Sequence, residues 1–513
     1  MNIKEHYDIA VVGAGPGGYS VALRASQLGK SALLVDRRPT PGGVCLHEGC
    51  IPSRALLRVA DTVRRTKRAA NLGFFRKDAV AGITRSDAID MEKTNAYKQG
   101  IVDAMISGLG GLLASRGVRY IQAEARVMKP GTVELHPSGG EQGPDALDEP
   151  VEIRAEDIVL ATGSHANELK NVPVSHRRIL DSTDALDLGL VPASALILGS
   201  GDVALEFAGI WAPLGTRVTL VERGERILRS ATKRVSAIVS RNLRQAGVAL
   251  VTQAQILSAS EDENTATLRY RDADGQVRSL SADVLLPAVG RVPNTGMDWL
   301  AGLGVALGAD PGEQGRILTD AVGRTNVPGI WAVGDVTPGK QLAHRAYAQG
   351  LVIAETIAGV EMTPLDDRTV PATTYGLAEN CSVGYTADEA RADARFADVA
   401  EDSYPMAGNA CTAMTGQAGI VTLVSGRLVP DLGGDDTGHA NTDAYDARAG
   451  ERVLLGAQMA GPQTADLAAE AEELIGNRIS IHDAARFVHP HPTISEALGE
   501  ALLLADGRPL HAR

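Results

Sequence analysis

The sequence predicts an α/β protein that contains two copies of one parallel-sheet unit, followed by a C-terminal region of mixed helices and strands. The first copy spans residues 7–37 and the second spans residues 195–223, about 185 residues further on. Each copy has a short apolar run, a glycine-rich turn, a helix-period segment and a second apolar run, which is the pattern of a βαβ unit. Copies this far apart predict two nucleotide-binding domains rather than a solenoid, whose repeats recur every ~20–50 residues.

The first copy carries the pattern GxGxxG. Gly13, Gly15 and Gly18 follow the first apolar run and open the predicted helix. Such glycines permit a tight turn and let the backbone approach a pyrophosphate, which lies at the positive N-terminal end of the helix. Asp36 ends the next apolar run, where a carboxylate can accept hydrogen bonds from ribose hydroxyls. We therefore expect a dinucleotide site here.

The second copy has Gly199 and Gly201, with alanine in place of the third glycine, which is a tolerated variant. Glu222 ends its second apolar run. A carboxylate at that position accepts from the free 2′-hydroxyl of NAD and repels a 2′-phosphate, so NAD is favoured over NADP. Arg223 and Arg226 lie close by and could serve a phosphate, which keeps NADP as the alternative.

A third apolar run, residues 325–333, ends in Gly334 and Asp335. A carboxylate at the end of a strand can hold a polyol hydroxyl, such as one on the ribityl chain of a flavin. The alternative is an ordinary strand and turn.

Two of the four cysteines, Cys45 and Cys50, lie five positions apart. Five residues of a regular helix rise about 7.5 Å, whereas a disulfide requires Cα atoms within about 4.4–6.8 Å. A disulfide would therefore need a distorted backbone, which Gly49 allows. A small strained ring in a reducing compartment is more typical of a catalytic disulfide than of a structural one. The alternative is two buried thiols at the start of a helix.

Near the C-terminus, His491 stands between two prolines, and Glu496 follows five residues later at the start of a final predicted helix. An imidazole restrained in this way can act as a general base while the carboxylate holds its other ring nitrogen. Histidines near helix starts are more often structural, and this is the alternative.

Composition limits the class of protein. The 513 residues include 50 Lys and Arg against 63 Asp and Glu, which gives a formal net charge of −13. This acidic balance argues against a nucleic-acid or anionic-membrane partner. Four cysteines are too few for a disulfide-stapled secreted scaffold, and no apolar stretch approaches the ~20 residues that span a bilayer. We therefore expect a cytoplasmic protein.

Taken together, these segments resemble the pyridine nucleotide–disulfide oxidoreductases. Besides the second glycine turn, the resemblance rests on six motifs in chain order: GAGPGG, GGVCLHEGCIPSRALL, ATGS, AVGRVPN, AVGDVTPGKQLAHRA and HPHPTISEA. They cover nearly the whole chain. The two-cysteine motif and the HPxxSE motif, in this order, are highly specific.

The resemblance implies two Rossmann-like dinucleotide-binding domains and a C-terminal α+β dimerisation domain. We expect an FAD-binding domain at 1–165, an NAD-binding domain at 166–285, a central domain that completes the FAD site at 286–360 and an interface domain at 361–513.

It also implies a route for electrons. FAD would lie in the first unit, and NAD would bind the second and exchange hydride with the flavin. Cys50 would be the thiolate in charge-transfer contact with the flavin, and Cys45 would meet the substrate dithiol. His491, supported by Glu496, would shuttle the proton in the partner subunit's site, so the enzyme would be a homodimer. The implied cofactor-binding residues are Gly13, Gly15, Gly18, Asp36, Arg54, Gly163, Gly199, Gly201, Glu206, Glu222, Gly290, Arg291, Gly334 and Asp335; no metal is expected.

The branch of the family that this chain resembles most oxidises dihydrolipoyl groups with NAD⁺, which regenerates the lipoyl groups of 2-oxo acid dehydrogenase or glycine cleavage complexes. Two alternatives are a related NAD(P)H-dependent reductase of a different small disulfide, and a redox-impaired flavoprotein with a structural role.

Some residues depart from the family pattern. Arg54 replaces a lysine and is expected to pair with Glu206, and Asp202 stands where an apolar or aromatic side chain usually lines the nicotinamide pocket. Segments 136–150 and 430–450 are rich in glycine, aspartate and proline, and we expect exposed loops or hairpin tips. For the other two cysteines, at 381 and 411, we expect small buried residues.

Overall fold

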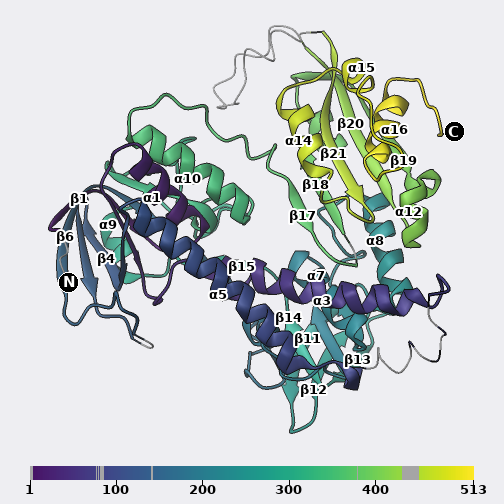
Figure 1. Cartoon of the computed structure of the whole chain (residues 1–513), viewed down its shortest axis with the longest axis horizontal. Helices are drawn as coiled ribbons and strands as arrows, with labels where there is room; N and C mark the ends of the chain where they lie inside the picture. The colour runs from purple at the N-terminus through teal and green to yellow at the C-terminus, as the bar shows by residue number, and fades with distance from the viewer. Residues whose placement is uncertain are drawn as a thin grey trace.

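In the computed structural model, residues 4–74, 76, 78, 80, 86–139, 142–377, 379–429 and 450–512 are described. The chain forms two sheet-based units joined through long helices, with a third, antiparallel sheet unit built from the C-terminal part (Figure 1). This confirms the predicted α/β class.

The first unit is a seven-stranded sheet in the order β3-β2-β1-β6-β5-β4, with β16 also paired to β6. Pairing is parallel from β3 through β6 and β16, and antiparallel at β5 and β4. Its strands are β1 His6–Val12, β2 Ala32–Asp36, β3 Arg119–Gln122, β4 Glu124–Lys129, β5 Thr132–His136, β6 Val151–Leu160 and β16 Ile330–Ala332. Its helices are α1 Pro16–Gln27, α2 Gly43–Glu48, α3 Cys50–Ala69, η1 Ser86–Ala88, α5 Met91–Ser115, α9 Asp298–Leu303, η2 Gly334–Val336 and α10 Ala343–Ile357.

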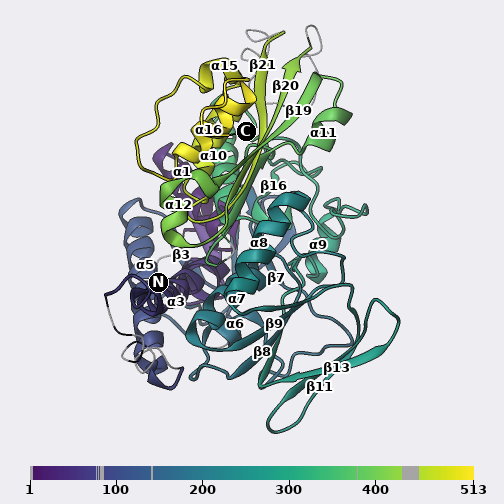
Figure 2. The same ribbon diagram turned by 90° about the vertical axis from the view of Figure 1, so that its right-hand side faces the viewer.

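The second unit has a four-stranded parallel sheet in the order β10-β9-β8-β14, next to an antiparallel meander of three strands (Figure 2). Its strands are β8 Ser194–Leu198, β9 Arg217–Val221, β10 Ala249–Val251, β11 Gln255–Glu261, β12 Ala266–Arg271, β13 Val277–Ala282 and β14 Val284–Pro287. Its helices are α6 Ser182–Leu186, α7 Asp202–Leu214 and α8 Lys233–Gln245. Two short paired strands, β7 Ser164–Ala166 and β15 Arg291–Pro293, connect the two units.

The third unit is an antiparallel sheet in the order β17-β18-β21-β20-β19, covered by helices packed on an apolar core. Its strands are β17 Ala372–Thr374, β18 Asn380–Gly384, β19 Phe396–Pro405, β20 Ile420–Leu428 and β21 Arg452–Ala460. Its helices are α11 Ala387–Ala392, η3 Met406–Gly408, α12 Ala410–Thr415, α14 Ala468–Gly476, α15 Ile481–Ala484 and α16 Glu496–Ala505. The domain boundaries stated above stay predictions.

Helix α3 of the first unit packs against α7 of the second, and this contact sets how the two nucleotide-binding units face each other (Figure 1). Gly209 of α7 makes the approach close, because a Cβ there would lie 3.3 Å from the side chain of Leu57 on α3. Leu57 belongs to a core cluster that extends into both units. The buried Lys98 of α5 adds a polar contact between the two units. Its Nζ donates to the carbonyl of Leu186 at 2.7 Å and pairs with Asp187.

The two segments expected to be loops have different outcomes. Within 136–150, Leu147 is buried in the first unit's core, and Gln122 of β3 accepts a hydrogen bond from the Gly143 N–H at 2.7 Å. The described part of this segment therefore packs back on the sheet, because one large apolar residue suffices to anchor it. Residues 430–449 lie outside the described residues.

Candidate active site

The first glycine turn has the shape that a dinucleotide requires. Gly13 has φ +107°, and a Cβ there would lie 2.2 Å from the Ala161 carbonyl. A Cβ on Gly18 would lie 1.8 Å from the Gly13 carbonyl. Gly15 caps α1 without any side-chain hydrogen bond. The first N–H groups of the helix are thus left for a phosphate oxygen, as the prediction of a pyrophosphate site needs.

The second turn repeats this geometry. Gly199 has φ +104°, and a Cβ there would lie 2.3 Å from the Ala288 carbonyl. Gly201 caps α7 without a side-chain hydrogen bond, and a Cβ on it would meet nothing within 4 Å. The space beside Gly201 is open, so the residues present fit a second pyrophosphate.

The two predicted ribose carboxylates also occupy equivalent places, at the ends of β2 and β9. Asp36 accepts hydrogen bonds from the backbone N–H of Ala14 at 2.8 Å and of Arg38 at 3.0 Å. Glu222 is buried and accepts from the Ser200 hydroxyl at 2.6 Å. Each carboxylate is therefore fixed against its own glycine turn, with acceptor capacity left for a hydroxyl group.

Several predicted cofactor residues lie close together at or beside the paired strands β7 and β15. The Ser164 hydroxyl donates to Asp335 at 2.6 Å, and Arg291 donates to the same hydroxyl at 2.7 Å. Gly163 and Gly334 precede Ser164 and Asp335 and have positive φ angles of 71° and 79°. Ser164 is the member of this cluster that we did not single out from the sequence. Gly290 has φ +112° and lies just before Arg291.

The two cysteines lie at a break between two helices. Helix α2 ends at Glu48 and α3 begins at Cys50, with Gly49 between them at φ −141° and ψ −112°, which is neither helical nor extended. The sequence analysis expected a distorted backbone at Gly49 only if a disulfide joined the two cysteines, and the helix is interrupted at Gly49 without one. Both cysteines are free thiols, and a hydrogen bond joins them.

The two thiols differ in acidity. The hydrogen bond from Cys45 lowers the pKa of Cys50, while the same bond and burial raise the pKa of Cys45. Cys50 is also the first residue of a 20-residue helix, whose N-terminal end stabilises an anion. The charge of Glu206 acts against ionisation of Cys50. The geometry therefore favours Cys50 as the thiolate of the pair.

A tyrosine pair near the dithiol was not found by sequence reasoning. The Tyr19 hydroxyl on α1 donates to that of Tyr347 on α10 at 2.8 Å. Burial raises the pKa of both phenols, and the charges of Cys45 and Cys50 raise it further. The pair therefore stays neutral, and no spacing pattern could have paired residues so distant in the chain.

Arg54 does not pair with Glu206 as the sequence analysis expected. Its guanidinium lies over the ring of Tyr375, 3.3 Å from the ring centroid, and no ion pair joins it to Glu206 in the described chain. Glu206 accepts instead from the Ser53 hydroxyl at 3.1 Å. A planar guanidinium stacks on an aromatic ring, which an ammonium cannot do, and this explains the difference.

Two acids stand on the same face of α7. Burial raises the pKa of Glu206 to about 7, although the Ser53 hydrogen bond acts in the opposite direction. Asp202 is exposed beside the glycine turn and accepts a hydrogen bond from the Thr374 hydroxyl of β17. The junction between α3, α7 and β17 thus holds one poorly solvated carboxyl group, that of Glu206, and one accessible carboxyl group, that of Asp202.

The predicted histidine–glutamate pair is formed. His491 Nδ1 lies 2.7 Å from Glu496 Oε1, and Glu496 also accepts from the Thr493 N–H at 2.8 Å. That backbone bond, followed by His491, lowers the pKa of Glu496. The His491 side chain is 79% exposed, and no described bond joins it to the dithiol segment of its own chain.

Behind this pair lies a second one that the sequence analysis did not identify. His489 is largely buried, its Nε2 lies 2.7 Å from Glu470 Oε1, and this bond raises the pKa of His489. Of the remaining cysteines, Cys381 is buried as predicted, whereas Cys411 is only half-buried against the same core.

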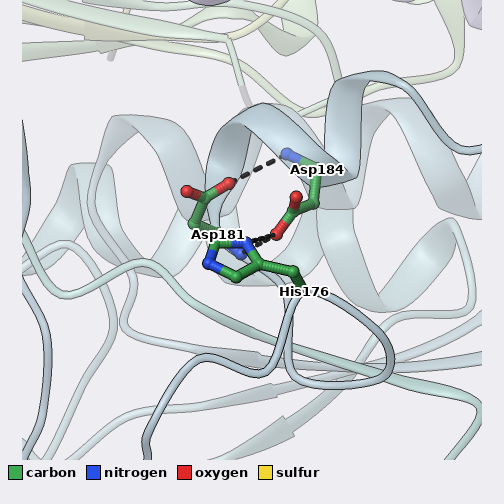
Figure 3. Close-up of side chains that lie close together, drawn as sticks. All are labelled: His176, Asp181 and Asp184. Atoms are coloured by element: carbon green, nitrogen blue, oxygen red, sulfur yellow. Dashed lines mark hydrogen bonds and ion pairs between the residues drawn. The ribbon is translucent and has the colours of Figure 1, made fainter.

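His176, Asp181 and Asp184 also lie close together (Figure 3). Asp181 and Asp184 form the capping box of α6, and Asp184 contacts His176 at 2.9 Å. Helix capping accounts for both carboxylates, so this cluster is not part of the site.

The chain belongs to the pyridine nucleotide-disulphide oxidoreductase family, whose pattern matches residues 7–350, and the dimerisation domain of that family matches residues 447–502. Its curated relatives include dihydrolipoyl dehydrogenases. The one from Geobacillus stearothermophilus is 34% identical over 98% of this chain and 96% of the relative. Those from Bacillus subtilis and Pseudomonas aeruginosa (dihydrolipoyl dehydrogenase 3) are 31% and 32% identical, over 98% and 99% of this chain and 97% and 100% of theirs.

Solved structures share the fold. LpdA from Mycobacterium tuberculosis matches with a TM-score of 0.79 at 23% identity, over 98% of this chain and all of that one. The HOCl-induced flavoprotein disulfide reductase RclA from Escherichia coli matches with a TM-score of 0.76 at 22% identity, over 97% and 100%. At these identities the likeness concerns the fold alone.

These comparisons confirm that the protein is an oxidoreductase of this family with FAD and NAD as cofactors, and the dimerisation domain supports a homodimer. Among the described helices, none has the length and apolar character needed to cross a bilayer. A cytoplasmic location stays a prediction.

We predict that Glu206 makes the stability of the protein depend on pH. Its pKa is raised from 4.5 to about 7, so between these values the folded protein keeps a proton that the unfolded chain has lost. The acid therefore destabilises the fold progressively as pH rises from about 4.5 to about 7, by at most about 3 kcal/mol. The Glu206→Gln variant lacks this penalty because an amide does not titrate.

The measurement is the Tm of both FAD-loaded proteins at pH 5 and pH 8. The Tm of the wild type minus that of Glu206→Gln should become more negative at pH 8. The exposed Glu263 provides a matched control, because Glu263→Gln makes the same substitution on the surface, away from the helix junction. A pH-independent difference for Glu206→Gln would contradict the raised pKa.

Proposed function

We propose that this protein oxidises protein-bound dihydrolipoyl groups with NAD⁺. One observation carries the proposal: the Cys45–Cys50 pair lies at the start of the helix that packs against the second nucleotide-binding unit. A dithiol in that place can pass two electrons from a substrate dithiol towards a dinucleotide. The full-length similarity to dihydrolipoyl dehydrogenases supports the choice of substrate.

The exchange would begin with the pair oxidised to a disulfide. A substrate thiolate attacks Cys45 Sγ, the bond between the cysteines breaks, and Cys50 leaves as the thiolate that its position favours. The second substrate thiol then attacks the substrate sulfur of the mixed disulfide and releases Cys45. Substrate dithiol becomes disulfide, and the pair has gained two electrons. Bound FAD supplies two-electron transfer between this dithiol and NAD⁺, which becomes NADH.

His491 would remove the proton from the substrate thiol. Because Glu496 holds Nδ1, the free Nε2 is the atom that accepts a proton from the substrate thiol. An ionised Glu496 also stabilises the imidazolium that results. The His489–Glu470 pair, which shares the same short segment, would restrain the backbone that carries His491.

We infer that His491 and Glu496 serve the dithiol of the partner subunit. In the chain, the exposed His491 closely follows Phe487 and Val488, which are 55% and 94% exposed. Large apolar side chains exposed together are typical of surfaces that a partner covers. A second copy of the chain would bury them and bring His491 to a dithiol.

The partners that present the substrate would be lipoyl domains of 2-oxo acid dehydrogenase or glycine cleavage complexes. We also propose the domain division at 1–165, 166–285, 286–360 and 361–513. The pairing of β16 with β6 supports the proposal that 286–360 completes the first nucleotide-binding unit.

We predict rapid formation of NADH when the purified holoenzyme is given dihydrolipoamide and NAD⁺. Cys45→Ser should abolish turnover because the mixed disulfide cannot form. His491→Ala should lower kcat by about 10²–10⁴-fold, which is the usual range for a general acid–base residue. The measurement is NADH absorbance under steady-state conditions, with glutathione disulfide and NADPH assayed in parallel.

Two results would contradict the proposal. Turnover of glutathione disulfide but not of dihydrolipoamide would assign a different disulfide substrate. Failure of NADH to reduce the flavin at all would favour the impaired flavoprotein with a structural role.

The shared active site makes a separate prediction. Cys50→Ser and His491→Ala protomers should each give nearly inactive homodimers. When the two variants are refolded or co-expressed together, their protomers pair at random, and about half of the dimers are mixed. Each mixed dimer has one intact site. Activity should therefore recover to about a quarter of the wild-type value. No recovery, with mixed dimers shown to be present by two different affinity tags, would place both residues in one subunit's site.

A further inference from the structure

Asp202 occupies an unusual place for a carboxylate. It is the first residue of α7, directly after Gly201 of the second glycine turn, and its side chain accepts from the Thr374 hydroxyl of β17. Helix α7 packs against both α3 and β17. The Asp202 carboxylate therefore lies where all three units of the fold meet.

This carboxylate lacks a cationic partner. In the described chain, no Arg, Lys or His side chain forms an ion pair with Asp202, and the Thr374 hydroxyl is the one group whose hydrogen bond favours its charge. Asp202 is exposed beside Gly201, so its carboxylate is accessible to a ligand that binds at this turn. An accessible carboxylate with no cation of its own chain beside it can pair with a positively charged group of a ligand bound at the turn.

The fold defines which end of a dinucleotide would come near Asp202. A pyrophosphate on the N-terminus of α7 has its adenosine ribose directed to Glu222 at the end of β9. The other end must then extend to the opposite side, towards α3. On that side Glu206, one turn after Asp202, contacts Ser53, three residues after Cys50. Asp202 thus lies between the nucleotide turn and the dithiol.

We propose that Asp202 is a specificity-determining residue that makes the protein bind NAD⁺ more tightly than NADH. The nicotinamide ring of NAD⁺ carries a positive charge, which the ring of NADH lacks. A carboxylate within about 4 Å of that charge contributes at least about a fivefold difference in affinity even at the dielectric constant of water. The bias favours substrate entry and product release in the direction of NADH formation.

This inference rests on the proposed function and adds the selection between the two redox forms of the cofactor. With an uncharged residue at position 202, the protein would bind NAD⁺ and NADH through the groups that the two cofactors have in common. The charge of Asp202 is therefore the property to remove, while its shape and its bond to Thr374 are kept.

The test uses equilibrium binding to the oxidised, FAD-loaded protein at pH 8, measured by isothermal titration calorimetry. The ligands are NAD⁺ and the tetrahydronicotinamide analogue of NADH, whose neutral ring cannot give up hydride. Asp202→Asn keeps the size and the Thr374 hydrogen bond. Glu263→Gln removes one charge from the exposed β11–β12 turn of the same unit and serves as the control.

Asp202→Asn should weaken NAD⁺ binding at least about fivefold and change the Kd of the analogue by less than about twofold, whereas Glu263→Gln should change neither. Equal weakening of both ligands would overturn the proposal, because Asp202 would then shape the pocket rather than select charge. Unchanged Kd values for both would overturn it as well. Charge-selective NAD⁺ binding without dihydrolipoamide turnover would refute the proposed substrate and leave this inference standing.

Discussion

The packing of α3 on α7 is the contact on which the rest of the site depends. Helix α3 starts at Cys50 and α7 starts at the second glycine turn, and their first turns meet through Ser53 and Glu206. Gly209 permits the helices to approach closely, and Leu57 fills the contact. The redox pair of one unit is thereby fixed next to the nucleotide turn of the other.

The same contact explains the unusual electrostatics. Two helix N-termini favour negative charge at their ends, which suits a thiolate at Cys50 and phosphates at Gly201. Burial between the units opposes charge, which raises the pKa of Glu206. Arg54 stacks on Tyr375 and forms no ion pair with Glu206 in the described chain, although its charge still acts to lower the pKa of Glu206. The junction therefore holds carboxyl groups whose ionisation changes when a charged ligand binds there.

The sequence predicted those parts of the site that one short segment determines. The glycine turns and the His491–Glu496 pair each depend on residues within a few positions of one another, and the backbone follows the local pattern. Contacts between distant segments could not be predicted in this way. Tyr19 meets Tyr347, and Asp202 meets Thr374, only because separate units pack together.

The expectation that Arg54 pairs with Glu206 was wrong for the same reason. Its planar guanidinium stacks on an aromatic ring of the third unit, a contact between distant segments that no local pattern predicts. Likewise, the composition of segment 136–150 suggested an exposed loop, whereas the buried Leu147 and hydrogen bonds to Gln122 hold its described part against the sheet. The composition of a segment indicates whether it favours a loop, whereas contacts with distant residues determine where the segment lies in the fold.

The most direct test of this account asks which cysteine is the thiolate. Cys45→Ser and Cys50→Ser holoenzymes are titrated with acid while the long-wavelength thiolate–flavin absorbance is recorded. The account predicts that Cys45→Ser shows this absorbance at neutral pH, because Cys50 remains at the start of α3, and that Cys50→Ser shows none. Absorbance in Cys50→Ser and its absence in Cys45→Ser would contradict the role of the α3 N-terminus.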